Sequence, residues 1–533
     1  GKNIVASVTA HAGRQSLGVG DPQGRTGDHT GLVLIQIRPE LVPDLGVSGM
    51  LAKLAAIRKP AGVASLASSS IQGGPPIGKP LTLTLRSSNV KQLEGLARAM
   101  VGRLSRIPGV INPSTDVESG GAEHRITVRG IIAAMGVSWL RGKGRDLAAE
   151  GKPWFLAVNL VNPHDVMFYD TDAPGTPVQS ARGLTHVARD PVDPLYARQW
   201  AFDLPQSHAQ PLDAPGRPPA HRDFLRSHDA LVGEIPNESA RWRRRHNYYL
   251  NCLRDADRNI AAVLDELDAA GLTERTIVIL TADHGDMDGA HQLHAKGAVA
   301  YREQNNVPMI VAHPAYPGGR TCGALTSHLD VAPTLVGLTN VDAPKRASIV
   351  GDLPGKDFSR LLADPAAAGP NALREGVLFN YNMFAYLDGD YLLKAVAHIQ
   401  AGGDPKRLKE AGLVPDLGKR GAVRSVFDGR YVFSRYFSPK QHNRPVTLEQ
   451  LYRLNDVELY DRVADPHEMV NLAAKPGSSS ELVLAMNEKL NRLIDSEVGE
   501  DRGQMLPGGA WEWVSGHPGV PSGASAGIVG DGR

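Results

Sequence analysis

Long apolar runs that end abruptly in polar clusters are the main feature of the middle of the chain. The stretch 153–165, PWFLAVNLVNPHD, is apolar until it reaches Asn-Pro-His-Asp, and 276–285, TIVILTADHG, ends in Asp-His-Gly. A third run, VPMIVAHP, occupies 307–314. Uninterrupted runs of this length are typical of strands buried on both faces of a parallel sheet. We therefore expect three such strands in this part of the chain.

Helical patterns separate these runs. The segment 238–271 predicts a long helix that closes at Gly271, and a second helix is predicted over 329–341. The apolar face of the long helix is formed by Leu253, Ile260, Val263, Leu264 and Leu267. Strands that alternate with helices indicate a doubly wound α/β fold, in which a site lies beyond the carboxyl ends of the strands. His164 and the Asp283-His284 pair are therefore expected at the same edge of one mostly parallel sheet.

The N-terminal part of the chain has a different texture. Strand patterns occupy 31–37, 80–86 and 124–129, and a helical pattern occupies 89–107, which together predict an α+β, ferredoxin-like segment. Residues 170–240 show little periodicity and predict a long surface excursion. The tail from Gly503 is rich in Gly, Pro and Ser and predicts poor order.

Composition narrows the classes of partner. The chain has 533 residues, a net charge of +1 and only 5% aromatic residues, so neither nucleic acid nor an anionic membrane surface is expected as a partner. No run reaches the roughly 18 apolar residues of a transmembrane helix. The two cysteines, Cys252 and Cys322, exclude a disulfide framework and suit a reducing compartment. These features favour a cytoplasmic location, or a periplasmic one if the N-terminus is processed.

Four ordered motifs resemble the sulfatase family of the alkaline-phosphatase superfamily. They are the strand KPWFLAVNLVNPHD, the helix-strand-loop segment 248–311 with TADHG and HAKG, the helix TSHLDVAPTLVGL, and VELYDRVADPHEMVNLA at 457–473. The resemblance covers about residues 139–500. It implies an alkaline-phosphatase-like α/β sandwich around a central, mostly parallel sheet, and hydrolysis of a small-molecule sulfate or phosphate ester.

The resemblance also implies roles for individual residues. Asp283 and His284 match a pair of ligands to one divalent ion, which we expect to be Mn²⁺, Mg²⁺ or Ca²⁺. Lys296 matches the lysine that binds the anionic oxygens of the ester. His164 matches a histidine that contacts the substrate or protonates the leaving group. His291 matches a supporting histidine in the loop between the metal strand and Lys296.

Each of these residues also has a structural interpretation. His164, after a proline, would then only cap a strand. Asp286 and His294 suit ordinary loop positions, and Cys252 suits the apolar side of a helix. Cys322, beside a glycine, is interpreted as structural.

Two features of the family are missing from residues 1–150. One is a strand that ends in Asp-Asp and supplies further metal ligands, and the other is a Cys-x-Pro-Ser-Arg turn whose first residue becomes formylglycine, the nucleophile. Neither cysteine of this chain lies in such a turn. Asp116, Glu118 and Asp165 remain open candidates for the missing carboxylates. A sheet without its central strand would also expose unpaired backbone groups.

Residues 72–138 resemble a porter subdomain of the resistance-nodulation-division efflux permeases. The resemblance rests on Gly-Pro-Pro-x-Gly-Lys-Pro, Ile-Pro-Gly-Val and Ala-Ala-x-Gly-Val-Ser, and it extends more loosely over 1–71. Transport needs membrane helices, so it is excluded for this chain. The predicted domains are a porter-like segment 1–138, a sulfatase-like domain 139–400, a C-terminal subdomain 401–502 and a flexible tail 503–533.

Three functions remain open. The first is a metal-dependent sulfuric ester hydrolase. The second is a phosphodiester or phosphonate monoester hydrolase, which the Asp283-His284 pair favours slightly. The third is a non-catalytic chain that binds an anion or a partner. The sequence identifies neither the alcohol half of the substrate nor the oligomeric state.

Overall fold

The computed structural model describes residues 129–176, 189–191, 193–339, 341–383 and 386–503, and, as backbone strands alone, 5–12, 30–37, 65–70, 80–86, 114–115 and 514–515. The chain divides into two compact units, 1–127 and 128–533. The four predicted domains stay a prediction.

The first unit contains a five-stranded sheet in the order β3-β4-β2-β1-β5. Its strands are β1 (Val5–Ala12), β2 (Thr30–Ile37), β3 (Ser65–Ser70), β4 (Pro80–Arg86) and β5 (Ser114–Thr115). Neighbours pair antiparallel except β1 and β5, which are parallel. The strands predicted at 31–37 and 80–86 are confirmed as β2 and β4. The helix predicted at 89–107 lies outside the described residues, as does the strand predicted at 124–129 except for Arg129.

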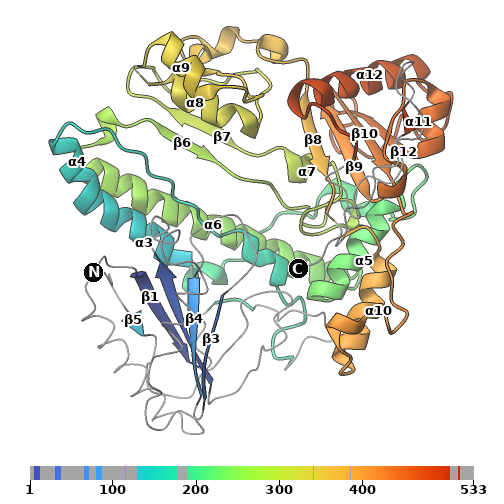
Figure 1. Cartoon of the computed structure of the whole chain (residues 1–533), viewed down its shortest axis with the longest axis horizontal. Helices are drawn as coiled ribbons and strands as arrows, with labels where there is room; N and C mark the ends of the chain where they lie inside the picture. The colour runs from blue at the N-terminus through green and yellow to red at the C-terminus, as the bar shows by residue number, and fades with distance from the viewer. Residues whose placement is uncertain are drawn as a thin grey trace, which may run out of the picture. The chain divides into compact units, whose positions relative to one another are not determined.

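The long predicted helix is confirmed as α6 (Ser239–Ala269), which crosses the second unit in Figure 1. Only part of its predicted apolar face is buried: Leu267 is buried, whereas Leu253 and Leu264 are exposed. Arg129 begins a further helix, α3 (Arg129–Trp139), which continues through a π-helical turn (Leu140–Gly144) into α4 (Arg145–Ala149). Leu140 and Leu267 share a core cluster, so α6 packs against this turn.

The expected parallel strands are not found. The strand β6 (Val278–Thr281) pairs antiparallel with β7 (Met309–Ala312), with Val278 opposite Ala312. This prediction was wrong because an apolar run reports burial but carries no information about the direction of its neighbour. Figure 1 shows this pair between α6 on one side and α8 (Val331–Gly337) and α9 (Ala343–Val350) on the other. The helix predicted at 329–341 is therefore confirmed as the shorter α8.

The run 153–161 is extended but pairs with no strand among the described residues. Its side chains alternate between half-buried and exposed positions. Trp154 and Leu156 pack into the cluster around Leu140 and Leu267, whereas Phe155 is 72% exposed. The segment is thus covered on one face by helices and open on the other, which corrects the expectation of a strand buried on both faces.

A second sheet forms the C-terminal part of this unit, in the order β12-β10-β9-β8. Its strands are β8 (Val377–Tyr381), β9 (Ala422–Phe427), β10 (Tyr431–Phe437) and β12 (Asn455–Asp461), all antiparallel. The helix α12 (Ser480–Glu497) covers one face of this sheet in Figure 1, and its Leu490 and Leu493 join Val426 and Phe433 in a core cluster. Polar Asp428-Gly429 turns the chain between β9 and β10, with Gly429 at φ 99°.

The described part of the segment 170–240 contains regular structure that its sequence does not indicate. It contains α5 (Ala220–Val232), in which His221, Phe224 and His228 are fully buried. The helix is rich in polar residues, and His221, Ser227 and His228 occupy buried positions beside Phe224. In the described part of the chain, no helix is both long and apolar enough to cross a membrane.

Candidate active site

His164 and Lys296 meet although 132 residues separate them in the sequence. His164 begins a 3-10 turn (His164–Phe168) directly after the extended segment 153–161, and Lys296 lies at the end of the loop that follows β6. The Lys296 ammonium Nζ donates a hydrogen bond of 2.8 Å to Nδ1 of His164. The imidazole is therefore neutral at Nδ1 and carries its hydrogen on Nε2. The pair presents an ammonium and an N–H donor at one place.

Asp283 and His284 lie just beyond the end of β6. The Asp283 side chain is 87% exposed, and its Oδ2 is 3.4 Å from Nε2 of His284. Nδ1 of His284 donates to the carbonyl of Gly285 at 2.8 Å, so Nε2 is left as the ligand nitrogen. A carboxylate oxygen and an imidazole nitrogen therefore face the same space.

Electrostatics link the two pairs. Burial and the Lys296 charge lower the pKa of His164, and the carboxylates of Asp165 and Asp283 oppose this. Burial also lowers the pKa of Lys296, against the carboxylates of Asp286 and Asp283. His164 and Lys296 are in direct contact, and the Asp283 charge influences the pKa of both.

A buried ion-pair network holds the loop that carries Lys296. Arg245 of α6 is 1% exposed and binds Asp286 at 3.0 Å and Asp288 at 2.6 Å. The Asp286 carboxylate also accepts hydrogen bonds from the backbone amides of Asp288 and Ala295, next to Lys296. Burial opposes ionisation of Asp286, but Arg245 and these amides hold its pKa below the usual value. Asp286 is therefore the residue that organises this loop.

His291 and His294 are both in the interior. His291 stacks on Tyr301 with ring centroids 3.7 Å apart, and its Nδ1 bonds Gln210 at 2.7 Å. His294 lies 3.7 Å from Asp229 and packs near His228. No described contact joins either histidine to Lys296, so the supporting role predicted for His291 stays a prediction.

The residues present fit a divalent ion in part. Asp283 and Nε2 of His284 supply one oxygen and one nitrogen, which suits Mn²⁺ or Mg²⁺ better than Ca²⁺. Within the described residues, no third carboxylate or histidine completes a close group with them. Of the open candidates, Asp165 lies beside His164, whereas Asp116 and Glu118 lie outside the described residues. Water or substrate oxygens would fill the other positions of the ion.

The cysteines do not contribute to this site. Cys252 is fully buried in a cluster with Val166, Tyr196 and Tyr248, which confirms its prediction as a core residue. Cys322 is exposed.

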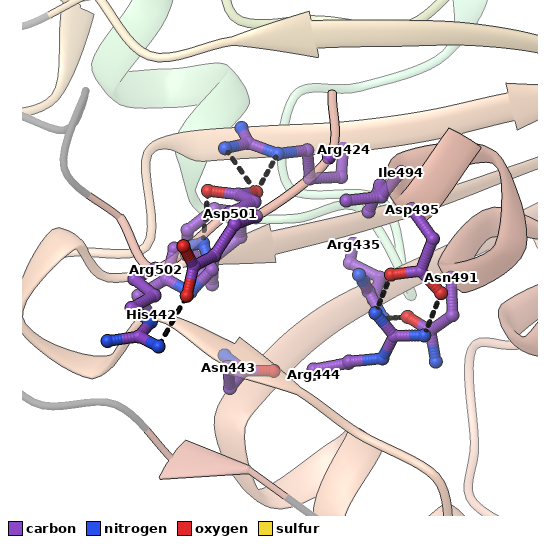
Figure 2. Close-up of a pocket in the computed structure, with 13 residues that line it drawn as sticks. Arg424, Arg435, His442, Asn443, Arg444, Asn491, Ile494, Asp495, Asp501 and Arg502 are labelled. Carbon is purple, nitrogen blue, oxygen red and sulfur yellow. Dashed lines mark hydrogen bonds and ion pairs between the residues drawn. The ribbon is translucent and has the colours of Figure 1, made fainter. Parts of the chain in front are cut away.

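A separate polar cavity lies in the C-terminal part of the second unit (Figure 2). It encloses about 220 Å³ and is lined by several arginines. Figure 2 shows Asp501 facing Arg424 and Asp495 facing Arg444, so these arginines are neutralised by carboxylates. Because none of the predicted site residues lines this cavity, it is not the candidate active site.

Sequence reasoning missed two residues near the site. Arg245 stands in the run RWRRRH, where nothing distinguishes it from its exposed neighbours. His328 begins the turn before α8, and its Nε2 contacts the carbonyl of Ala282 at 2.8 Å, one residue before Asp283. The motif TSHLDVAPTLVGL contains His328, but the sequence does not show that this motif packs against the end of β6.

Comparisons with known proteins find similarity to sulfatases. The family model described as Sulfatase matches residues 131–341. An ulvan-active sulfatase of Formosa agariphila is 26% identical over 368 residues, which cover 66% of this chain and 61% of that protein. An endo-4-O-sulfatase of Bacteroides thetaiotaomicron is 27% identical over 39% of each chain. Among solved structures, a putative sulfatase from Bacteroides thetaiotaomicron is 18% identical with a TM-score of 0.49, over 74% of this chain and 70% of that one.

The chain spans 61% or less of the length of these two curated relatives. The sulfatase match begins at residue 131, inside the segment 72–138 that was compared with efflux permeases. The resemblance to a porter subdomain is not supported by these matches. The match to the Sulfatase family model covers residues 131–341, the part of the chain that carries His164, Asp283, His284 and Lys296.

Proposed function

We propose that this chain is a metal-dependent sulfuric ester hydrolase that acts on a small anionic ester. The observation that carries the proposal is the 2.8 Å contact between Lys296 and His164, beside the Asp283-His284 pair. In the proposed site these pairs would offer a cation, an N–H donor and two metal-ligating atoms to one substrate. The same groups are required to bind a sulfate ester and to stabilise charge on its leaving oxygen.

Lys296 is the anchor for the anionic oxygens. An ammonium is a compact point charge, and its partial burial makes its attraction for an anion stronger than in bulk water. The network of Arg245 with Asp286 and Asp288 fixes the loop, so the charge is positioned before the substrate arrives.

His164 faces the leaving group. Its Nδ1 accepts from Lys296, so Nε2–H is the atom that donates to the ester oxygen. An anion bound by Lys296 would take over the hydrogen bond of the ammonium and offset its lowering of the His164 pKa, so Nδ1 could gain a hydrogen and the imidazole become protonated. His164 would then protonate the departing alkoxide as a general acid.

Asp283 and His284 are the proposed metal ligands. A divalent ion at this position would withdraw electron density from the sulfate oxygens and so favour nucleophilic attack. The nucleophile is not assigned to a residue, since neither Cys252 nor Cys322 is followed by x-Pro-Ser-Arg. The structure therefore supports roles in anchoring, metal binding and proton donation.

Hydrolysis of p-nitrophenyl sulfate by the full chain tests the proposal, with Mn²⁺, Mg²⁺ or Ca²⁺ added in turn. We expect metal-dependent turnover and a loss of roughly 10²–10³-fold in kcat/KM in Lys296→Ala, the size seen when a preorganised charge is removed. Lys394→Ala is the matched control, because Lys394 lies exposed on α10 (Gly389–Gln400). Absence of turnover with every metal, or equal turnover in Lys296→Ala, would overturn the proposal.

A phosphate ester is the second candidate substrate. His284 favours it, because many arylsulfatases have Asp-Asn at this position, whereas an Asp-His pair also suits related enzymes that act on phosphate esters. The same assay with bis-p-nitrophenyl phosphate and with an aryl phosphonate separates the two activities. A larger kcat/KM for either phosphorus ester than for the sulfate would assign the site to phosphorus chemistry.

The third candidate is anion binding without turnover. The 87% exposure of Asp283 favours it, because such an open carboxylate holds an ion weakly. Binding of inorganic sulfate that Lys296→Ala abolishes, with no hydrolysis of any ester, would support this function instead.

A further inference from the structure

Three metal-ligating side chains from distant segments meet in the interior of the second unit. They are His291 of the loop after β6, Glu303 of α7 (Arg302–Asn305), and Glu468 after β12. One ligand atom of each lies within 4.8 Å of those of the other two. His291 and Glu468 are fully buried, and Glu303 is half-buried.

Each of these side chains has a buried polar atom without a hydrogen-bond partner. Nδ1 of His291 is used by Gln210, and Nε2 is left unpartnered. One oxygen of Glu468 accepts from the backbone amide of Arg302 at 2.9 Å, while Oε1 has no hydrogen bond. Oε2 of Glu303 is also without a partner. Buried polar atoms are almost always paired in native proteins, so three in one place indicate a ligand.

The cluster also has unbalanced charge. Burial raises the pKa of Glu468 to about 7, and the neighbouring Glu303 contributes to the rise. The cation closest to Glu468 Oε1 among the described ion pairs is Nε of Arg462, which at 3.8 Å is beyond hydrogen-bond distance. Two carboxylates therefore approach one another around a neutral imidazole, with only distant compensation.

A second acidic cluster of this chain provides a useful contrast. Asp223, Asp388 and Asp390 also lie close enough to hold an ion. The Lys419 ammonium occupies their centre, at 2.6, 2.9 and 3.3 Å from the three carboxylates. That cluster is neutralised by the chain itself, whereas no ammonium reaches the unpartnered atoms of His291, Glu303 and Glu468 in the described part of the chain.

We propose that His291, Glu303 and Glu468 form a second divalent-metal site, separate from Asp283 and His284, that takes an ion of the manganese or zinc class. Two carboxylate oxygens and one imidazole nitrogen are a ligand set that these ions accept and that leaves positions for water. Gln210 accepts a hydrogen bond from Nδ1 of His291 and so fixes the orientation of the ring, as the hydrogen-bond partners of metal-bound histidines commonly do.

The ion would link the loop after β6, which carries Lys296, to the C-terminal part of the second unit. His291, Gln292 and Ala295 have φ of 55°, 58° and 61°, a conformation that side chains other than glycine adopt at a cost. Coordination of His291 would hold this strained backbone in place. Lys296 directly follows it, so the second ion acts on the active site by positioning.

The number of metal ions bound per chain, measured after dialysis of the full chain against MnCl₂ or ZnCl₂, tests the proposal without any activity assay. The wild type is compared with Glu303→Gln, Glu468→Gln and the exposed control Glu481→Gln, each also in an Asp283→Asn, His284→Gln background. We expect both cluster variants to lose one bound ion in either background and the control to lose none. The ion should also raise Tm for the wild type and the control by several degrees more than for the cluster variants.

Equal ion counts and equal Tm shifts in the wild type and Glu303→Gln would overturn the proposal. So would an Asp283→Asn, His284→Gln variant that binds no ion. If Glu468→Gln fails to fold, Glu303→Gln decides alone, because Glu303 is half-buried and its change keeps the side-chain volume. The result is independent of whether the chain hydrolyses esters.

Discussion

At the scale of single residues, the site depends on charges that are paired away from solvent. Lys296 and His164 are the residues that would touch a substrate, but Asp286 and Arg245 determine where Lys296 lies. The sequence identifies the first two through motifs. It assigns Asp286 to an ordinary loop position, because its partner lies 41 residues earlier on a helix. Local patterns carry no information on such a pairing.

Removal of the buried arginine tests this dependence. Arg245→Leu leaves Asp286 and Asp288 buried without a cation, so we expect the free energy of unfolding to fall by roughly 3–5 kcal/mol. Denaturant unfolding followed by circular dichroism measures the change. Arg243→Leu is the control on the same helix, because Arg243 is 52% exposed and its partner Asp203 is 93% exposed. A control loss above about 1 kcal/mol would show that the effect comes from the helix and not from the ion pairs.

At the scale of elements, a close backbone approach joins β6 to α7. The amide of Gly285 donates to the carbonyl of Gln304 at 2.7 Å. A Cβ at residue 285 would lie 1.9 Å from the carbonyl oxygen of Glu303. Glycine is therefore required directly after Asp283-His284. The contact of Gly285 with α7 links the end of β6 to Glu303 of the proposed second site.

Gly285→Ala should therefore displace α7 from the end of β6. We expect a loss of roughly 1–3 kcal/mol of stability, the usual cost of forcing extra volume into a packed site. Thermal unfolding measures it. The control is Gly318→Ala, since nothing lies within 4 Å of a Cβ at that residue. If both variants unfold alike, the contact of Gly285 with α7 does not stabilise this region.

The elements also show which features of the fold can be predicted from sequence patterns. Helix α6 and strands β2 and β4 were predicted because their patterns span a whole element. The direction of β7 was not predicted, because pairing depends on which strand lies alongside. The hairpin of β9 and β10 was overlooked, although Asp428-Gly429 between apolar runs is a strong turn signal. His164 and Asp283 were expected together from the ends of parallel strands, but the run before His164 is not a paired strand and β6 is antiparallel to β7, so their place in one active site stays a prediction.

At the scale of the whole molecule, the second unit has a sheet region that is open on one face. Phe155 is 72% exposed and Ile310 of β7 is 56% exposed, while Trp154 and Leu156 on either side of Phe155 pack in a core cluster. Exposed apolar groups on extended backbone favour association with other chains. The sequence predicts unpaired backbone groups only through the family resemblance, which implies a missing strand near the centre of the sheet.

Substitution of one exposed side chain tests the consequence for solubility. Phe155→Gln should lower concentration-dependent light scattering and change the free energy of unfolding by less than about 0.5 kcal/mol. The adjacent Leu156→Gln is the opposite case, because Leu156 packs in the cluster around Leu140 and Leu267 and its change should destabilise the unit. Unchanged scattering in Phe155→Gln would show that this face does not mediate association.

In a paired strand the side chains are packed and the backbone amides are hydrogen-bonded, but the extended segment 153–161 has only packed side chains. Its inward side chains, such as Trp154 and Leu156, are held in a core cluster, yet none of its backbone amides has a partner among the described residues. Hydrogen exchange follows the amides and not the side chains. The backbone amides of the segment that leads directly to His164 would therefore exchange as fast as those of a loop, although its side chains are packed like those of a strand. His164, the proposed proton donor, is thus preceded by backbone whose amides have no partner in the described part of the chain.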